Sequence, residues 1–189
     1  DGYKSQGQGI GRSEGLAIAS LDMFASGLFS GAPRAPFRVD AGVLAKLPLA
    51  ALTSAFQVTD ANPLLGLEGR TDLLQRLGRL AAERADVFGL HDSPRPGGLF
   101  DYIAAQAKDG TIAAPAILSA VLHQLGPIWP SRLELAGIPL GDCWRHPALQ
   151  TDDATTGLVP LHKLSQWLSY SLIEPLQRAG FDVTAIAGL

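Results

Sequence analysis

The chain has 189 residues, with 15 Lys and Arg against 18 Asp and Glu, which gives a formal net charge of -3. Hydrophobic residues make up 47% of the chain and charged residues only 17%, which excludes intrinsic disorder, a state that requires low hydrophobicity and high net charge. The absence of a basic excess argues against a nucleic-acid binder, and no apolar run is long enough to span a bilayer.

The chain begins with a Gly- and Gln-rich stretch, residues 1–12, which we expect to be loose. Ser13 then has the character of an N-cap, and apolar residues at helical spacing predict a helix that runs to Gly27. The two prolines of residues 31–37 predict a loop after this helix.

Two further helices are predicted before the middle of the chain. Pro48 suits the first turn of a helix that Asn62-Pro63 ends. Residues 67–85 form the clearest amphipathic pattern, with a stripe of leucines facing inward: Leu73, Leu74, Leu77 and Leu80.

The second half opens with a Pro- and Gly-containing loop over residues 89–98, followed by a short helix over 99–107. Pro115 opens a helix that is apolar almost all round, which is typical of a buried helix. Alternating apolar residues over 133–140, around a turn at Ala136-Gly137, fit a small hairpin.

The last helix is predicted over residues 161–179, opened by Pro160, kinked at Pro175 and closed by Gly180. The whole pattern predicts a mainly α fold with one small β-hairpin, organised as a single helical domain over residues 1–189.

This last helix carries hydrogen-bonding side chains on both flanks of its leucine stripe. One flank has His162, Gln166 and Ser169, and the other has Lys163, Trp167 and Tyr170. Such side chains can line a polar pocket for a small molecule. The alternative is a partly buried helix whose polar groups bond neighbouring backbone, and the pattern does not choose between the two.

Residues 141–147 place an acid, a thiol, an indole, a guanidinium and an imidazole side by side. Asp142 could serve as a general base or stabilise a cation, and Arg145 could hold a phosphate or a carboxylate. His146 adds a group that can gain or lose a proton.

Metal ligation is the weaker hypothesis for this segment. Asp142, Cys143, His146 and His162 are permissible ligands, but their spacing matches no zinc pattern, so we predict neither a metal nor another cofactor. The lone Cys143 is more typical of packing than of a nucleophile, and it can form no intrachain disulfide. A chain with one cysteine and no signal peptide fits the cytoplasm.

Glu68 and Arg70 stand near the start of the helix predicted over residues 67–85. Glu68 suits the first turn because of the helix dipole. The helical phase carried back from the leucines puts Arg70 on the apolar face. Either the helix starts later, or this guanidinium points into the fold and needs a partner.

Six segments together resemble the fungal and bacterial uracil-catabolism protein four family, a domain of unknown function. They are GRSEGL (11–16), NPLLGLEGR (62–70), RPGGLFDY (95–102), LGPIWP (125–130), GDCWRHP (141–147) and the last helix with its approach (158–176). Family members are longer, so the resemblance implies that this chain is their C-terminal half and that the N-terminal half of the same protein is a partner. The family is associated with a pathway that releases urea from a ribosylurea-type intermediate.

Residues 47–79 and the last helix are also similar to the queuosine salvage protein family. That family hydrolyses an N-glycosidic bond on an all-α scaffold like that of DNA glycosylases, which is the scaffold implied here. It has Asp-Tyr-Arg near the start of the corresponding last helix, where this chain has Leu161-His162-Lys163.

The resemblance implies a hydrolase that cleaves an N-ribosidic bond and takes a small ribosyl or nucleotide-like substrate. Asp142 would then stabilise the oxocarbenium-like state and activate water, with His162 and Lys163 assisting the leaving group or binding phosphate. The remaining candidates would bind substrate: Arg145 at a phosphate, Gln166 and Trp167 at the base or urea, and His146, Glu68 and Arg70.

Two alternatives belong to other classes of function. One is a non-catalytic helical module that binds a partner enzyme, which the low charge density fits, and the other is a metal-dependent hydrolase. We expect parts of the longer protein to cover apolar surface of this chain, with a homo-oligomer as the other explanation of that surface. We expect no contact with nucleic acid or membrane.

Overall fold

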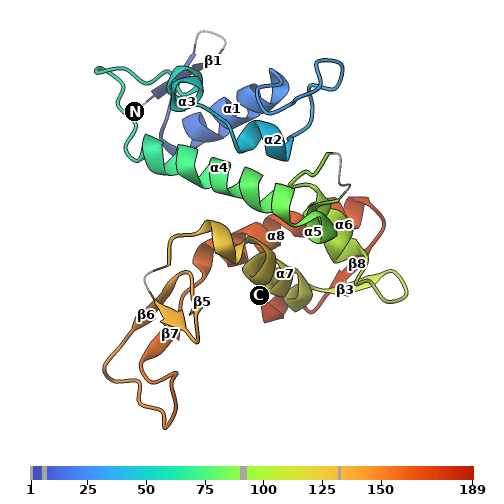
Figure 1. Cartoon of the computed structure of the whole chain (residues 1–189). Coiled ribbons are helices and arrows are strands. Elements are labelled where there is room, and N and C mark those ends of the chain that lie inside the picture. The colour runs from blue at the N-terminus through green and yellow to red at the C-terminus, as the bar shows by residue number, and fades with distance from the viewer. Residues whose placement is uncertain (1, 6–7, 90–92, 132) are drawn as a thin grey trace. The chain divides into compact units, whose positions relative to one another are not determined.

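The structure is a computed structural model that describes residues 2–5, 8–89, 93–131 and 133–189. Its fold is mainly α, with short strands in small sheets (Figure 1). The chain forms two compact units, Asp1–Gly97 and Gly98–Leu189. The single domain over residues 1–189 stays a prediction, because the compactness of each unit does not decide whether they fold together.

The first unit begins with a hairpin of β1 (Gly2–Ser5) and β2 (Gln8–Gly11), in which Tyr3 lies opposite Ile10. The expectation of a loose start was therefore wrong for the residues that the structure describes there. Helix α1 (Arg12–Ala25) follows β2 directly, so its N-cap is Gly11 rather than Ser13. The described part of residues 1–12 does not include 1, 6 and 7.

Three short helices and one long helix complete the first unit. They are α2 (Ala41–Leu44), α3 (Leu49–Ala55), α4 (Leu67–Glu83) and α5 (Ala85–Phe88). One core cluster consists of Ala19, Met23, Leu47, Leu52 and Leu67, with partly buried side chains such as Phe56 and Leu74 packed against it. Other buried apolar residues of this unit include Leu44, Val87 and Phe88. The predicted inward leucines of α4 are half-buried, and the fully buried stripe of this helix is Leu67, Thr71, Gly78 and Ala81.

Helix α4 approaches α2 closely at Gly78. A Cβ at this position would lie 2.2 Å from the backbone nitrogen of Ala45 and 2.6 Å from the carbonyl oxygen of Ala41. Only a residue without a side chain fits there, so Gly78 fixes how closely these two helices pack.

The buried carboxylate of Asp40 stabilises the segment that leads into α2. Asp40 accepts hydrogen bonds from Nε of Arg38 at 2.7 Å and from the N–H of Gly31 at 2.7 Å. Burial alone would raise the pKa of Asp40, but the hydrogen bonds from Arg38 and Gly31 and the charges of Arg38 and Arg95 outweigh it, so the pKa lies below its usual value.

The second unit packs three helices, α6 (Gly98–Ala104), α7 (Ala114–Leu125) and α8 (Lys163–Arg178). The buried side chains of α7 include Ile117, Val121 and Leu125, as expected of a helix apolar almost all round. A 3₁₀ turn over Gly126–Ile128 ends α7, and a second one over Ile186–Gly188 lies near the end of the chain.

Three two-stranded sheets accompany these helices. The predicted hairpin is confirmed as β4 (Glu134–Leu135) and β5 (Ile138–Pro139), whose turn residues Ala136 and Gly137 have φ of 51° and 76°. The pairs β3 (Thr111–Ala113) with β8 (Asp182–Thr184), which is parallel, and β6 (Cys143–Arg145) with β7 (Leu158–Pro160), which is antiparallel, were not predicted.

The start of the last helix also differs from the prediction. Pro160 belongs to strand β7, where it lies opposite Cys143, so it does not open the helix. The helix begins at Lys163 after His162, which is its N-cap in the left-handed conformation. A loop was also predicted over residues 89–98, and residues 90–92 of this range lie outside the described residues.

Candidate functional site

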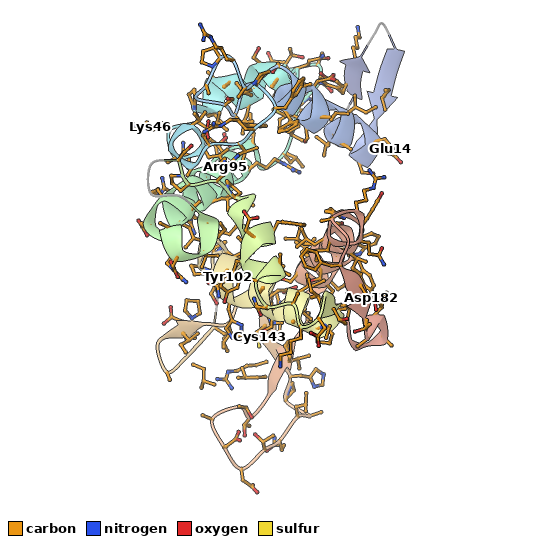
Figure 2. The ribbon with its side chains drawn as sticks, turned by 90° about the vertical axis from the view of Figure 1, so that its right-hand side faces the viewer. Glu14, Lys46, Arg95, Tyr102, Cys143 and Asp182 are labelled. Carbon is orange, nitrogen blue, oxygen red and sulfur yellow. The ribbon has the colours of Figure 1, made fainter. Side chains whose placement is uncertain are left out.

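Asp142 and His162 are brought together by the β6–β7 ladder. Cys143 opens β6 and is paired with Pro160, the last residue of β7. Asp142 therefore comes immediately before one strand and Leu161 immediately after the other, and the N–H of Leu161 donates to the carbonyl oxygen of Asp142 at 2.9 Å. Figure 2 labels Cys143, which marks this end of the ladder.

The backbone takes the left-handed conformation just before β6 and just after β7. Gly141 has a φ of 61° and His162 a φ of 39°, and histidine is among the residue types that adopt the left-handed region more often than most. A Cβ at Gly141 would lie 3.5 Å from Cε1 of His162, so the imidazole packs directly against the Gly141 backbone. This contact places the imidazole beside the segment that carries Asp142.

Both side chains line one cavity of about 470 Å³ in the second unit. This volume is within the range of about 300–1,000 Å³ that is usual for small-molecule sites. Most of the wall is apolar, from α7, the β4–β5 hairpin and the start of α8, and it includes Val121, Leu122, Trp129, Ile138, Leu140, Trp144 and Leu164. The polar lining consists of His123, Asp142, His162 and Ser165, with the Cys143 thiol beside them.

Asp142 is held by a neighbour on β6. Nε1 of the Trp144 indole donates to Oδ1 of Asp142 at 2.9 Å, and both side chains are exposed at the cavity. This bond orients the carboxylate and leaves Oδ2 without a hydrogen-bond partner among the described residues.

His123 is a cavity residue that the sequence did not single out. Its Nδ1 lies 2.7 Å from the carbonyl oxygen of Ser119, one helical turn earlier on α7. Oγ of Ser119 lies 3.2 Å from the same nitrogen, so Ser119 orients this imidazole. Its sequence signal was its place in the last turn of a mostly apolar helix.

The other predicted residues of the last helix lie outside this cavity lining. Lys163 is exposed, and the indole of Trp167 is 71% exposed. Nε2 of Gln166 donates to the carbonyl oxygen of Leu189 at 2.9 Å, so this side chain ties α8 to the last residue of the chain. Their proposed roles at a substrate stay predictions.

Arg145 and His146 are also outside the lining. The Arg145 guanidinium donates to the carbonyl oxygen of Thr156 and holds the loop between β6 and β7. Nδ1 of His146 accepts from the N–H of Ala148 at 3.2 Å. Both side chains are exposed, and these bonds stabilise the local turn.

Glu68 and Arg70 belong to the first unit. Helix α4 begins at Leu67, so it does not start later than predicted, and Arg70 is exposed rather than pointing into the core. Arg70 lines a separate cavity of the first unit, whereas Glu68 does not.

Across the described residues, no three His, Cys, Asp or Glu side chains gather closely enough to hold a metal ion. None of the described helices has the length and apolar character needed to cross a membrane.

Comparison with known proteins gives a match over nearly the whole chain. Residues 2–189 match the family described as "Protein of unknown function (DUF1688)". The chain is 38% identical over 182 residues to "Uracil catabolism protein 4" of Lachancea kluyveri, and 38% identical over 179 residues to "Protein urg3" of Schizosaccharomyces pombe.

These two alignments cover 92% and 93% of this chain but only 41% and 40% of the relatives. The chain therefore spans less than half the length of the curated relatives that it matches. No solved structure matches it. The family match over residues 2–189 shows that the chain belongs to the family described as Protein of unknown function (DUF1688).

Proposed function

We propose that this chain is part of a protein of uracil catabolism and that its second unit carries a hydrolase site for the N-ribosidic bond of a ribosylurea-type compound. The name of the Lachancea kluyveri relative supports the pathway. The observation that carries the site is that Asp142 and His162 line one largely apolar cavity.

The chemistry needs a carboxylate beside the sugar and a proton donor beside the leaving group. When the bond between C1′ and the urea nitrogen breaks, the bonding electrons leave with nitrogen and positive charge develops on C1′ and the ring oxygen. Asp142 stabilises this charge and accepts a proton from the attacking water, while His162 supplies a proton to the nitrogen. Water adds to C1′, so the products are ribose and urea.

The largely apolar wall favours this reaction because a charge beside apolar groups is screened less than in bulk water, which strengthens the attraction between Asp142 and the charge on the sugar. The indole of Trp144 keeps Asp142 oriented, and Trp129 and Trp144 offer flat faces against which a sugar can pack. His123 is a second imidazole in the lining and a further candidate to accept the proton of water. Lys163 and Arg145 stay candidates for a phosphate on the substrate.

A non-catalytic role in binding a partner enzyme is the second candidate. Helix α8 exposes large side chains, with Leu164 69% exposed, Trp167 71% and Tyr170 47%. Exposed apolar surface of this kind is typical of protein interfaces. In that role, loss of the His162 imidazole would leave function largely intact.

The test is hydrolysis by the full-length protein of ribosylurea and its 5′-phosphate. Urea is measured as one product, and ribose or ribose 5-phosphate, respectively, as the other. Full-length His162→Gln should lose about 10²-fold or more in rate, whereas His146→Gln, which removes an imidazole outside the cavity, should stay near wild type. The hydrolase assignment fails if the wild-type protein neither cleaves nor binds either compound. Equal rates for wild type and His162→Gln would contradict the role of His162.

A further inference from the structure

The first unit has a second cavity, which the hydrolase proposal does not use. Its volume is about 340 Å³, at the lower end of the range usual for small-molecule sites. It lies where β2, the first turn of α1, the end of α3 and the start of α4 come together. It is lined by Tyr3, Ile10, Ser13, Gly15, Leu16, Phe56, Asn62, Pro63, Leu64, Leu65 and Arg70.

The wall next to α1 is set by backbone packing. A Cβ at Gly15 would lie 2.4 Å from the carbonyl oxygen of Ile10, so only glycine permits this approach of α1 to β2. Glu14, the neighbour of Gly15, is labelled in Figure 2 and marks the start of α1. This close packing of α1 on β2 fixes the position of Ile10 and Leu16, two lining residues on this side of the cavity.

Among the lining residues that the structure describes, Arg70 is the one that carries a charge. Arg76 and Arg79 of the same helix pair with Asp72, at 2.8 Å and 3.8 Å. Within the described ranges, by contrast, Arg70 makes no ion pair and its guanidinium makes no hydrogen bond. A guanidinium with five donors in a fixed fork is suited to a carboxylate or a phosphate.

The neighbouring polar groups are already engaged. The Tyr3 hydroxyl donates to Oδ2 of Asp22 at 2.8 Å, and the Ser13 hydroxyl donates to Oε2 of Glu14 at 3.2 Å. Both O–H groups are therefore already used as donors, so in the described lining the charge comes from Arg70, and most of the other lining side chains are apolar. The described lining therefore combines one cationic side chain with a mostly apolar wall.

We propose that this cavity binds a small molecule with one anionic group on an apolar body, the anion being held by Arg70 and the body by Leu16, Phe56 and Leu64. Phosphate and carboxylate share the chemistry that Arg70 recognises, and the two are separated by experiment. The site shares no residue with the cavity of Asp142, so each proposal can fail while the other holds.

The test is calorimetric titration of the full-length protein with phenyl phosphate, benzoate and benzyl alcohol. We expect saturable binding of one or both anions, and binding of the uncharged alcohol at least about ten-fold weaker. The tighter anion identifies the group that the site takes. Absence of saturable binding by both anions would overturn the proposal.

Variants assign the binding to Arg70. Arg70→Gln should weaken the anion at least about ten-fold, and Arg70→Lys should keep more of the affinity because it keeps the charge. Arg76→Gln removes the same charge from the same helix outside the cavity, and should bind as the wild type does. An equal loss in Arg76→Gln, or a loss in Asp142→Asn instead, would overturn the assignment. If Arg70→Gln fails to fold, Arg70→Lys is compared with Arg76→Gln. Weaker anion binding by Arg70→Lys alone supports the assignment to Arg70, and equal binding by the two variants contradicts it.

Discussion

Substitution of Gly78 by alanine tests the closest helix contact of the first unit. On helix propensity alone, this change inside α4 would stabilise the protein by about 1 kcal/mol. The new methyl group, however, would lie 2.2 Å from the nitrogen of Ala45 and 2.6 Å from the oxygen of Ala41, both backbone atoms of the α2 segment. Because backbone cannot rotate away as a side chain does, α2 and α4 must move apart.

Overpacking of this kind typically costs about 1–3 kcal/mol, so we expect Gly78→Ala to be destabilised despite its better propensity. Gly69 provides the control, because it lies in the same helix with no atom within 4 Å of a Cβ. Gly69→Ala should be neutral or stabilised by up to about 1 kcal/mol.

The assay is urea unfolding of both variants and the wild type, followed by circular dichroism, with the midpoint and slope compared. The expected result is a lower midpoint for Gly78→Ala and an unchanged or higher midpoint for Gly69→Ala. A Gly78→Ala protein as stable as Gly69→Ala would refute the close packing of α4 on α2.

Two further predictions concern carboxylates and their partners. The pKa of Asp40 is lower in the folded protein than in the unfolded chain, where it is about 4. The stability that Asp40 contributes is therefore fully present at pH values above the unfolded pKa, and it is lost as the pH falls through the folded pKa. In urea unfolding at neutral pH, Asp40→Ala should lower the free energy of unfolding by about 1–3 kcal/mol, and the loss of stability at acid pH should become less steep. The control Asp86→Ala breaks an exposed pair with Arg84 and should change the free energy of unfolding little. Trp144→Phe removes the indole donor to Asp142, and we expect a roughly ten-fold lower kcat with a smaller change in KM; an unchanged kcat would show that this bond does not orient the carboxylate.

The helices could be predicted from sequence because their signals are local. Leucine spacing and Gly27 defined segments close to those observed, and Ala136-Gly137 supplied a turn with two positive φ values. The helix expected to run as far as Asn62-Pro63 was wrong at its end, because α3 already ends at Ala55. The strands β3, β6, β7 and β8 have three residues each, too few for an alternating pattern, and β3 pairs with β8 from the far end of the unit. Such pairing depends on tertiary packing rather than on local sequence.

The same reason limits what could be predicted of the candidate site. Asp142 and His162 were each chosen for their chemistry, but only the β6–β7 ladder places them beside one another. His123 was missed because an imidazole on an apolar helix is indistinguishable by spacing from a surface residue. Arg70 was placed on the apolar face by helical phase, yet one turn from the start of α4 it lies at the rim of a cavity.

The most direct test of the hydrolase site compares two carboxylates in the full-length protein. Asp142→Asn keeps the shape of the side chain but removes the charge at the cavity, and Asp152→Asn makes the same change in the exposed loop between β6 and β7. The measurement is kcat/KM for release of urea from ribosylurea. We expect Asp142→Asn to fall by about 10²-fold or more and Asp152→Asn to match the wild type. Equal values for the two variants would contradict the assignment of catalysis to this cavity.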